Sequence, residues 1–274
     1  MLSAALSCLL GYNGGAAPFG TYLSIWIAAG LTGMHACLTA VLLVITAEAV
    51  VAGSLEEAKT AYDKGDFRRA ERIYSELSNQ GDRIAQLQLG LMYDEGHGIP
   101  KQNQQAVRWF SVASSQGDPE APYYLGRIYQ DGRGGQKNDR RARLWYHVAA
   151  QRGHHKAAVN LGVMYAFGLG GPKNYQAAGQ WFLLAADHGD IRAQDNLGVL
   201  YQNGEGVRTD YIKAYMWFAL AAAASGDSEA VKHRVQIAQL MEPSQIEQAQ
   251  RLSSEKMYAL IRCHIVPTLP CHWW

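Results

Sequence analysis

The chain has 274 residues, 48% of them hydrophobic and 18% charged, so it is long and apolar enough to bury a core and is not of the disordered class. Its formal net charge of +1 gives no support for a strongly basic surface, and we therefore expect no nucleic-acid partner. Its four cysteines lie near the two ends of the chain, which excludes a fold held together by many disulfide bonds.

The first 52 residues differ in charge from the rest of the chain. They contain no Lys or Arg, and Glu48 is their only acidic residue. Residues 19–52 run almost without charge and exceed the roughly 20 apolar residues that are needed to cross a bilayer. We therefore interpret residues 1–52 as a hydrophobic signal peptide or membrane anchor.

Three interpretations of this segment stay open. A secretory signal would have its apolar centre at residues 38–46 and small-residue cleavage sites that end at Ala49 or Ala52, with Met34 as a candidate start, but the usual positive n-region is missing. An uncleaved anchor would instead leave the basic residues between 59 and 69 on the cytoplasmic side. The third interpretation is a structural apolar segment. We expect an exported or periplasmic protein, which is membrane-anchored if the segment is uncleaved.

After residue 80 the sequence repeats with a period of 36 residues. The recurring positions include a tryptophan and a Leu-Gly pair, at Trp109, Trp145, Trp181 and Trp217 and at Leu89-Gly90, Leu125-Gly126, Leu161-Gly162 and Leu197-Gly198. A fixed period of about 20 to 50 residues is typical of stacked arrays, in which no unit buries its apolar face alone. Four copies therefore occupy residues 81–226, and such an array favours binding over catalysis.

In the copy from Gly117 to Gly153 the residue spacing predicts two helices. The first helix follows Asp118, which can cap it, and ends at Gly132, because glycine adopts the left-handed conformation of many helix termini. Gly126 lies in the middle of this helix, where glycine is unfavourable by about 1 kcal/mol relative to alanine. Its recurrence indicates that another helix approaches too closely for a Cβ atom.

The second helix is predicted to begin at Asp139 and to bury four positions. These positions have i, i+3, i+4 and i+7 spacing and are Ala142, Trp145, Tyr146 and Ala149. Large rings that alternate with alanines suit a helix interface, because one helix fills the space that small residues of its neighbour leave. Truncation of Trp145 to alanine is then expected to destabilise the fold by about 3–5 kcal/mol.

At these residues the sequence resembles the Sel-one-like repeat (SLR) family, a relative of the tetratricopeptide repeat with a longer turn between its helices. The resemblance implies an all-α fold, a right-handed α-solenoid of antiparallel helix pairs with a 36-residue repeat. Residues 54–80 resemble a tetratricopeptide unit and are expected to form an N-terminal cap. Residues 227–262 are expected to form C-terminal capping helices, and residues 263–274 a loose tail.

Histidine and cysteine clusters were considered as metal sites, but their spacing argues against one. His154 and His155 occupy a turn that is Gly-Asp in other copies, and adjacent residues do not project toward one point on a helix. The tail pairs Cys263-His264 and Cys271-His272 do not match structural zinc fingers, which leaves a disulfide or an inert tail. The Gly-x-Gly pairs follow a helix and do not lead from a strand into one, so they do not indicate a nucleotide site. We expect no metal, no cofactor and no catalytic residues.

The resemblance also implies a binding surface. In tetratricopeptide arrays the first-helix residues outside the core line a concave groove, and the corresponding positions here are Leu87, Leu91, Tyr123, Arg127, Gln130, Val159, Val163, Asp195, Val199 and Gln202. This groove is mixed apolar and polar, which suits an extended or helical peptide. The alternative for these residues is packing between repeats, because the curvature of a solenoid decides their exposure.

The resemblance favours a non-catalytic interaction scaffold that binds a protein or peptide partner in its groove, in the bacterial envelope. Two rival functions stay open. A few relatives of the family bind cell-wall fragments or β-lactams, so a hydrolase-like repeat protein is the enzyme-class alternative. The cysteine pairs that mark those relatives are absent from these repeats. The second rival is a structural spacer tethered to the membrane.

Overall fold

The structure is a computed structural model that describes residues 54–225 and 228–265. All regular elements in these residues are helices, and no strand occurs among them, so the predicted all-α fold is confirmed. The apolar segment 19–52 lies outside the described residues, and none of the described helices is both long and apolar enough to span a bilayer. The chain divides into two compact units, Met1–Ala85 and Gln86–Trp274.

The described part of the first unit contains a helix pair, formed by residues 54–63 and α4 (Phe67–Asn79). Asp66 caps α4 by accepting a hydrogen bond from the backbone N–H of Arg69 (3.3 Å), because the first N–H groups of a helix have no partner within it. The Arg69 side chain also pairs with Glu57 of the preceding helix (2.8 Å). Burial raises the pKa of Tyr74 to about 12, because the core disfavours the charged phenolate.

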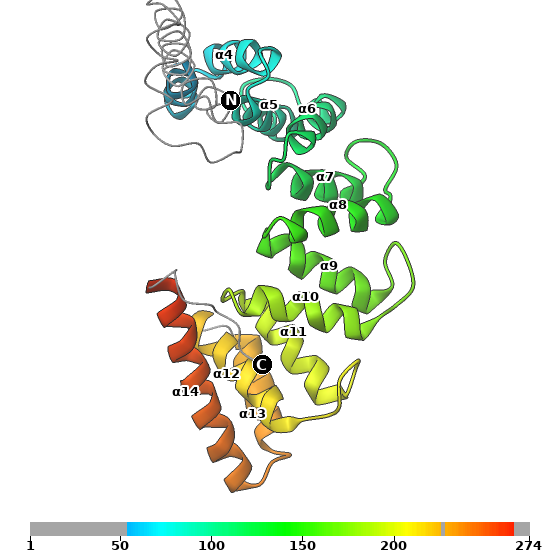
Figure 1. Ribbon diagram of the computed structural model, residues 1–274, viewed down its shortest axis with the longest axis vertical. Coiled ribbons are helices and arrows are strands. Elements are labelled where there is room, and N and C mark those ends of the chain that lie inside the picture. The colour runs from blue at the N-terminus through cyan, green and yellow to red at the C-terminus, as the bar shows by residue number, and fades with distance from the viewer. Residues whose placement is uncertain (1–53, 226–227, 266–274) are drawn as a thin grey trace, which may run out of the picture. The chain divides into compact units, whose positions relative to one another are not determined.

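Helix pairs follow one another in chain order through the second unit, as Figure 1 shows. The first helices of the four repeats are α5 (Arg83–Glu95, which begins in the first unit), α7 (Ala121–Asp131), α9 (His155–Phe167) and α11 (Ile191–Asn203). The second helices are α6 (Asn103–Ser115), α8 (Asp139–Gln151), α10 (Tyr175–Ala186) and α12 (Tyr211–Ser225). Two closing helices, α13 (Ser228–Ala238) and α14 (Pro243–Ile265), both pack against α12.

The helix ends follow the predicted capping chemistry, and the start of α7 follows it in part, because α7 begins at Ala121 with Glu120 as its N-cap residue. Asp118 accepts a hydrogen bond from the backbone N–H of Ala121 (2.8 Å), although α7 is regular only from Ala121 onward. At its other end α7 is closed by Gly132, which takes the left-handed conformation (φ 72°). Gly168 and Gly204 end α9 and α11 in the same way, with φ of 71° at each.

The core of each repeat is built on a contact between a ring and a glycine. The rings belong to second helices and are at most 1% exposed, and the glycines belong to first helices; the pairs are Phe110 on Gly90, Tyr146 on Gly126, Phe182 on Gly162 and Phe218 on Gly198. An added Cβ atom at Gly126 would stand only 2.6 Å from atoms of the Tyr146 ring. The prediction that this glycine allows a close helix approach is therefore confirmed.

The most deeply buried ring is not the predicted tryptophan. Trp145 is only partly buried, as are its counterparts in the two adjacent repeats, whereas Tyr146 is 0% exposed. Only Trp217 of the fourth repeat is buried as predicted, at 3% exposed. Ala142 and Ala149 are also 0% exposed, and their spacing puts Tyr146 at the centre of the buried face. Trp145 lies about 100° around the helix, at the edge of that face. We therefore expect the large loss of stability on truncation of Tyr146, and not on truncation of Trp145.

Candidate partner-binding surface

Nine of the ten predicted groove residues reach the surface of the described structure. Arg127 is exposed, and the partly exposed residues are Leu87, Leu91, Tyr123, Gln130, Val163, Asp195, Val199 and Gln202. Residues four positions apart lie on one side of a helix, so α5, α7 and α11 each present two of them together. These nine side chains are therefore at least partly accessible. Five of them also pack against the hydrophobic core, namely Leu87, Leu91, Tyr123, Val163 and Val199.

The exception is Val159, whose side chain is 1% exposed and belongs to the hydrophobic core. Valine has the shortest side chain of the four residues at this repeat position, where the other copies carry Leu87, Tyr123 and Asp195. Neighbouring side chains therefore cover it. The prediction that Val159 faces the groove is corrected, and on α9 only Val163 remains.

Tyr123 is the centre of an aromatic and basic cluster. Its ring stacks on the imidazole of His154, with 4.2 Å between the ring centroids, and the Arg127 guanidinium lies 5.9 Å from its centroid. His154 caps α9, because its Nδ1 accepts a hydrogen bond from the backbone N–H of Ala157 (3.1 Å). Its Nε2 is then the donor to Glu120 (3.2 Å). These contacts hold the Tyr123 ring in one orientation and leave Arg127 exposed.

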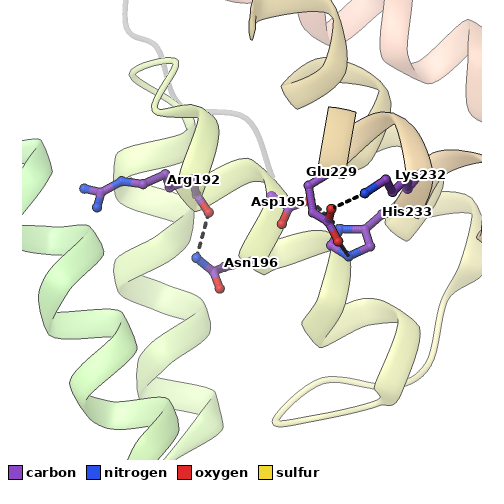
Figure 2. A network of polar contacts seen from close by, with 6 residues as sticks. All are labelled: Arg192, Asp195, Asn196, Glu229, Lys232 and His233. Atoms are coloured by element: carbon purple, nitrogen blue, oxygen red, sulfur yellow. Dashed lines mark hydrogen bonds and ion pairs between the residues drawn. The ribbon is translucent and has the colours of Figure 1, made fainter. Parts of the chain in front are cut away.

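Gln130 and Asp195 already have partners within the protein. The Tyr146 hydroxyl donates a hydrogen bond to Oε1 of Gln130 (2.6 Å), and burial raises the pKa of that phenol above its ordinary value. Oδ1 of Asp195 lies 2.8 Å from Nδ1 of His233 on α13, and the other imidazole nitrogen lies 3.9 Å from Glu229 (Figure 2). A partner would have to compete with these contacts, so both side chains first support the fold.

A depression between α8 and α9 was missed by sequence reasoning. It has a volume of about 680 Å³ and is lined by Arg140, Arg141, Arg143, Leu144, His147 and Tyr165, together with an asparagine. The guanidinium of Arg143 lies over the Tyr165 ring, 3.7 Å from its centroid. The one signal in the sequence is a group of three arginines within four residues. That signal does not reveal the ring beneath Arg143, which the fold brings from another helix.

Histidines at the turns between repeats make ring contacts. His155 stacks on His188 with 3.8 Å between ring centroids. Burial lowers the pKa of His155, and the neighbouring His188 lowers it further, so its surroundings favour the neutral imidazole. The described residues include no group of three or more His, Cys, Asp or Glu side chains that could hold a metal ion. The side chains of the tail pairs at 263–264 and 271–272 lie outside this description.

Comparison with protein-family models matches the Sel1 repeat at residues 83–118, 119–154, 155–190 and 191–225. Among solved structures, a Sel1 repeat protein from Oxalobacter formigenes is 30% identical, with a TM-score of 0.61 over 74% of this chain and 84% of that one. A protective antigen of uropathogenic Escherichia coli strains with an SLR fold is 25% identical over 82% of this chain, with a TM-score of 0.47, and this chain spans 58% of its length. An immunity protein from Pseudomonas aeruginosa is 17% identical, with a TM-score of 0.40 over 78% of this chain and 84% of that one. No curated protein sequence matches the chain.

Proposed function

Because the chain belongs to the Sel1 repeat family, we propose that it is a non-catalytic scaffold that holds a protein or peptide partner on the first-helix surface of its repeats. Sel1 repeat proteins are generally protein-interaction scaffolds. The first-helix surface of this chain combines aliphatic, aromatic and charged side chains, which suits a polypeptide partner. We propose the bacterial envelope as the place where this partner is met.

Comparison of the four copies distinguishes positions that keep the same role in every repeat from positions that vary. Every copy keeps the Leu-Gly pair of its first helix and the buried ring of its second helix. The two surface positions differ among the copies, with leucine, tyrosine, valine and aspartate at one and leucine, arginine, valine and valine at the other. Apart from the buried Val159, the side chains at these two positions reach the surface, so their chemistry can differ between copies to match a partner.

The pair Tyr123 and Arg127 is the observation that carries the proposal. Tyrosine and arginine are enriched among the residues that dominate binding energy at protein interfaces. Stacking on His154 fixes the Tyr123 ring before a partner arrives, so less side-chain entropy is lost on binding. We expect the partner to contact α7 at this pair.

Replacing Tyr123 and Arg127 together by alanine is expected to weaken partner binding about 30-fold or more. Truncation of a dominant interface residue costs about 2 kcal/mol or more, and each 1.4 kcal/mol corresponds to roughly a tenfold change in Kd. The partner would be captured from the native cells, identified by mass spectrometry, and titrated as a purified protein against both forms of the chain by calorimetry.

The chain offers a matched control for this experiment. Tyr258 and Arg262 on α14 are the same residue types at the same spacing, and both are exposed. The Tyr258→Ala/Arg262→Ala variant should bind the partner as tightly as the wild type. Unchanged affinity in a Tyr123→Ala/Arg127→Ala variant that melts at the wild-type temperature would rule out the proposed surface, and so would an equal loss in both variants.

We further propose that the chain is exported, because residues 19–52 are long and apolar enough to enter a membrane and are followed by small residues suited to cleavage. Mass spectrometry of the protein from native cells is expected to find a mature N-terminus at Val50 or Gly53. The cleaved protein should appear in the periplasmic fraction. A chain that still begins at Met1 or Met34, recovered with the membranes, would show that the segment is an anchor and that export with cleavage is wrong.

A further inference from the structure

The charge in the depression between α8 and α9 is unbalanced. Its lining includes three arginines and no acidic side chain. No carboxylate of the described residues forms an ion pair with Arg140, Arg141 or Arg143, and Asp139, which lies beside them in sequence, is instead 3.5 Å from Lys137. Arg140 and Arg141 also stand in the first turn of α8, where the partial positive charge of a helix N-terminus disfavours cations. An anion bound here would relieve this repulsion.

Arg143 is held in place by three neighbours. Its guanidinium lies 3.7 Å from the centroid of the Tyr165 ring, and its Nη1 donates to the backbone carbonyl of Pro172 (3.5 Å). Nη1 also lies directly against Gly171, where an added Cβ atom would overlap it. A guanidinium held in this way is a planar fork that matches the two oxygens of a carboxylate.

The other repeats show that stacking does not require these arginines. Three positions near the start of the second helix are Arg140, Arg141 and Arg143 in this copy. The corresponding residues of the other copies are Gln104, Gln105 and Val107, then Gln176, Ala177 and Gly179, then Ile212, Lys213 and Tyr215. The tyrosine equivalent to Tyr165 recurs in every copy. The three arginines therefore occur together in one repeat only, whereas the tyrosine that lies beneath Arg143 is present in all four repeats.

The surroundings of the arginines favour a peptide over other polyanions. Leu144 is 61% exposed at the edge of the depression, and Tyr165 adds a partly exposed ring, so apolar contacts accompany the charge. Nucleic acids bind along tracks of basic residues that neutralise several phosphates, and anionic membranes recruit clusters of about four to eight basic residues. We propose that this depression binds a glutamate or aspartate side chain of a peptide segment that also carries an apolar residue. The proposal rests on the proposed role in polypeptide binding, but it uses none of the ten predicted groove residues.

Two libraries of short synthetic peptides test this inference. The libraries share random positions of Ala, Leu, Ser and Tyr and differ only at two fixed positions, which are glutamate in one and glutamine in the other. The full chain is expected to retain the glutamate library about tenfold more strongly than the glutamine library at low salt, because a charge-assisted pair with arginine is much stronger than a neutral one. The Arg140→Gln/Arg141→Gln variant, and separately Arg143→Gln, should reduce retention of the glutamate library to the level of the glutamine library.

The control variant is Arg72→Gln/Arg192→Gln, which removes two exposed arginines outside the depression and should retain the glutamate library fully. Melting curves of all variants confirm that they are folded. Equal retention of the two libraries, or preference for glutamate that survives loss of the arginines, would overturn the inference. Binding to phosphatidylserine vesicles that depends on the same arginines, without preference for the glutamate library, would also overturn it. Because Tyr123 and Arg127 are intact in every variant here, failure of this site is distinguishable from failure of the first-helix surface.

Discussion

Replacement of Phe182 by alanine is expected to lower the free energy of unfolding by about 3–5 kcal/mol. The ring is 1% exposed, and its nearest atom would lie 2.5 Å from a Cβ atom built on Gly162. Truncation leaves a cavity that Gly162 cannot fill, because it has no side chain. Phe182 also belongs to a core cluster that runs through several repeats, so the loss should weaken the stacking of neighbouring repeats as well.

Trp181 provides the comparison, since it precedes Phe182 and has a larger side chain but is only partly buried. Its indole contacts the His147 ring at the edge of the buried face, with 5.4 Å between centroids. Trp181→Ala should therefore cost clearly less than Phe182→Ala when the unfolding of both variants is followed in urea by circular dichroism at 222 nm. If the tryptophan variant lost as much stability, the central place assigned to the second ring would be wrong.

The helix pairs were predictable because most of the recurring positions mark residues that packing requires. Gly126 is an example, since a glycine in the middle of a helix is unfavourable unless something needs its small size, and the Tyr146 ring does. The sequence could not decide between Trp145 and Tyr146, because neighbouring residues differ by only about 100° around the helix axis. The rotation of the helix depends on what its neighbours bury.

The candidate binding surface was less predictable, because its residues do not recur. The tetratricopeptide pattern places Val159 and Tyr123 at equivalent positions, yet only the longer side chain emerges from the core. For the depression between α8 and α9, the sequence shows the charged residues but not their surroundings. Its arginines are visible in the sequence, but only the fold brings Tyr165 under Arg143 and leaves Leu144 exposed beside them.

Replacing Gly170 by alanine is expected to destabilise the chain by about 2–5 kcal/mol. Gly170 has φ of 72°, a conformation that costs alanine about 1–2 kcal/mol, and an overpacked site adds about 1–3 kcal/mol. The added Cβ atom would overlap the backbone carbonyl of Asp139 and lie 2.8 Å from the backbone nitrogen of Arg140. The equivalent Gly206 stands in the same way against the backbone of Tyr175 and Gln176, so this contact joins each of these loops to the preceding repeat.

Gly189→Ala is the matched control, because Gly189 has φ of 81° and no neighbouring atom within 4 Å of an added Cβ. The free energy of unfolding of Gly189→Ala should fall only by the cost of the left-handed conformation, about 1–2 kcal/mol, when its unfolding is followed in urea. Equal losses at the two glycines would mean that the loop does not rest on the start of α8. Since Arg140 lies at that contact, Gly170→Ala should also weaken retention of the glutamate library, whereas Gly189→Ala should not. The urea experiment and the peptide-retention experiment would then be two independent tests of the contact between Gly170 and the start of α8.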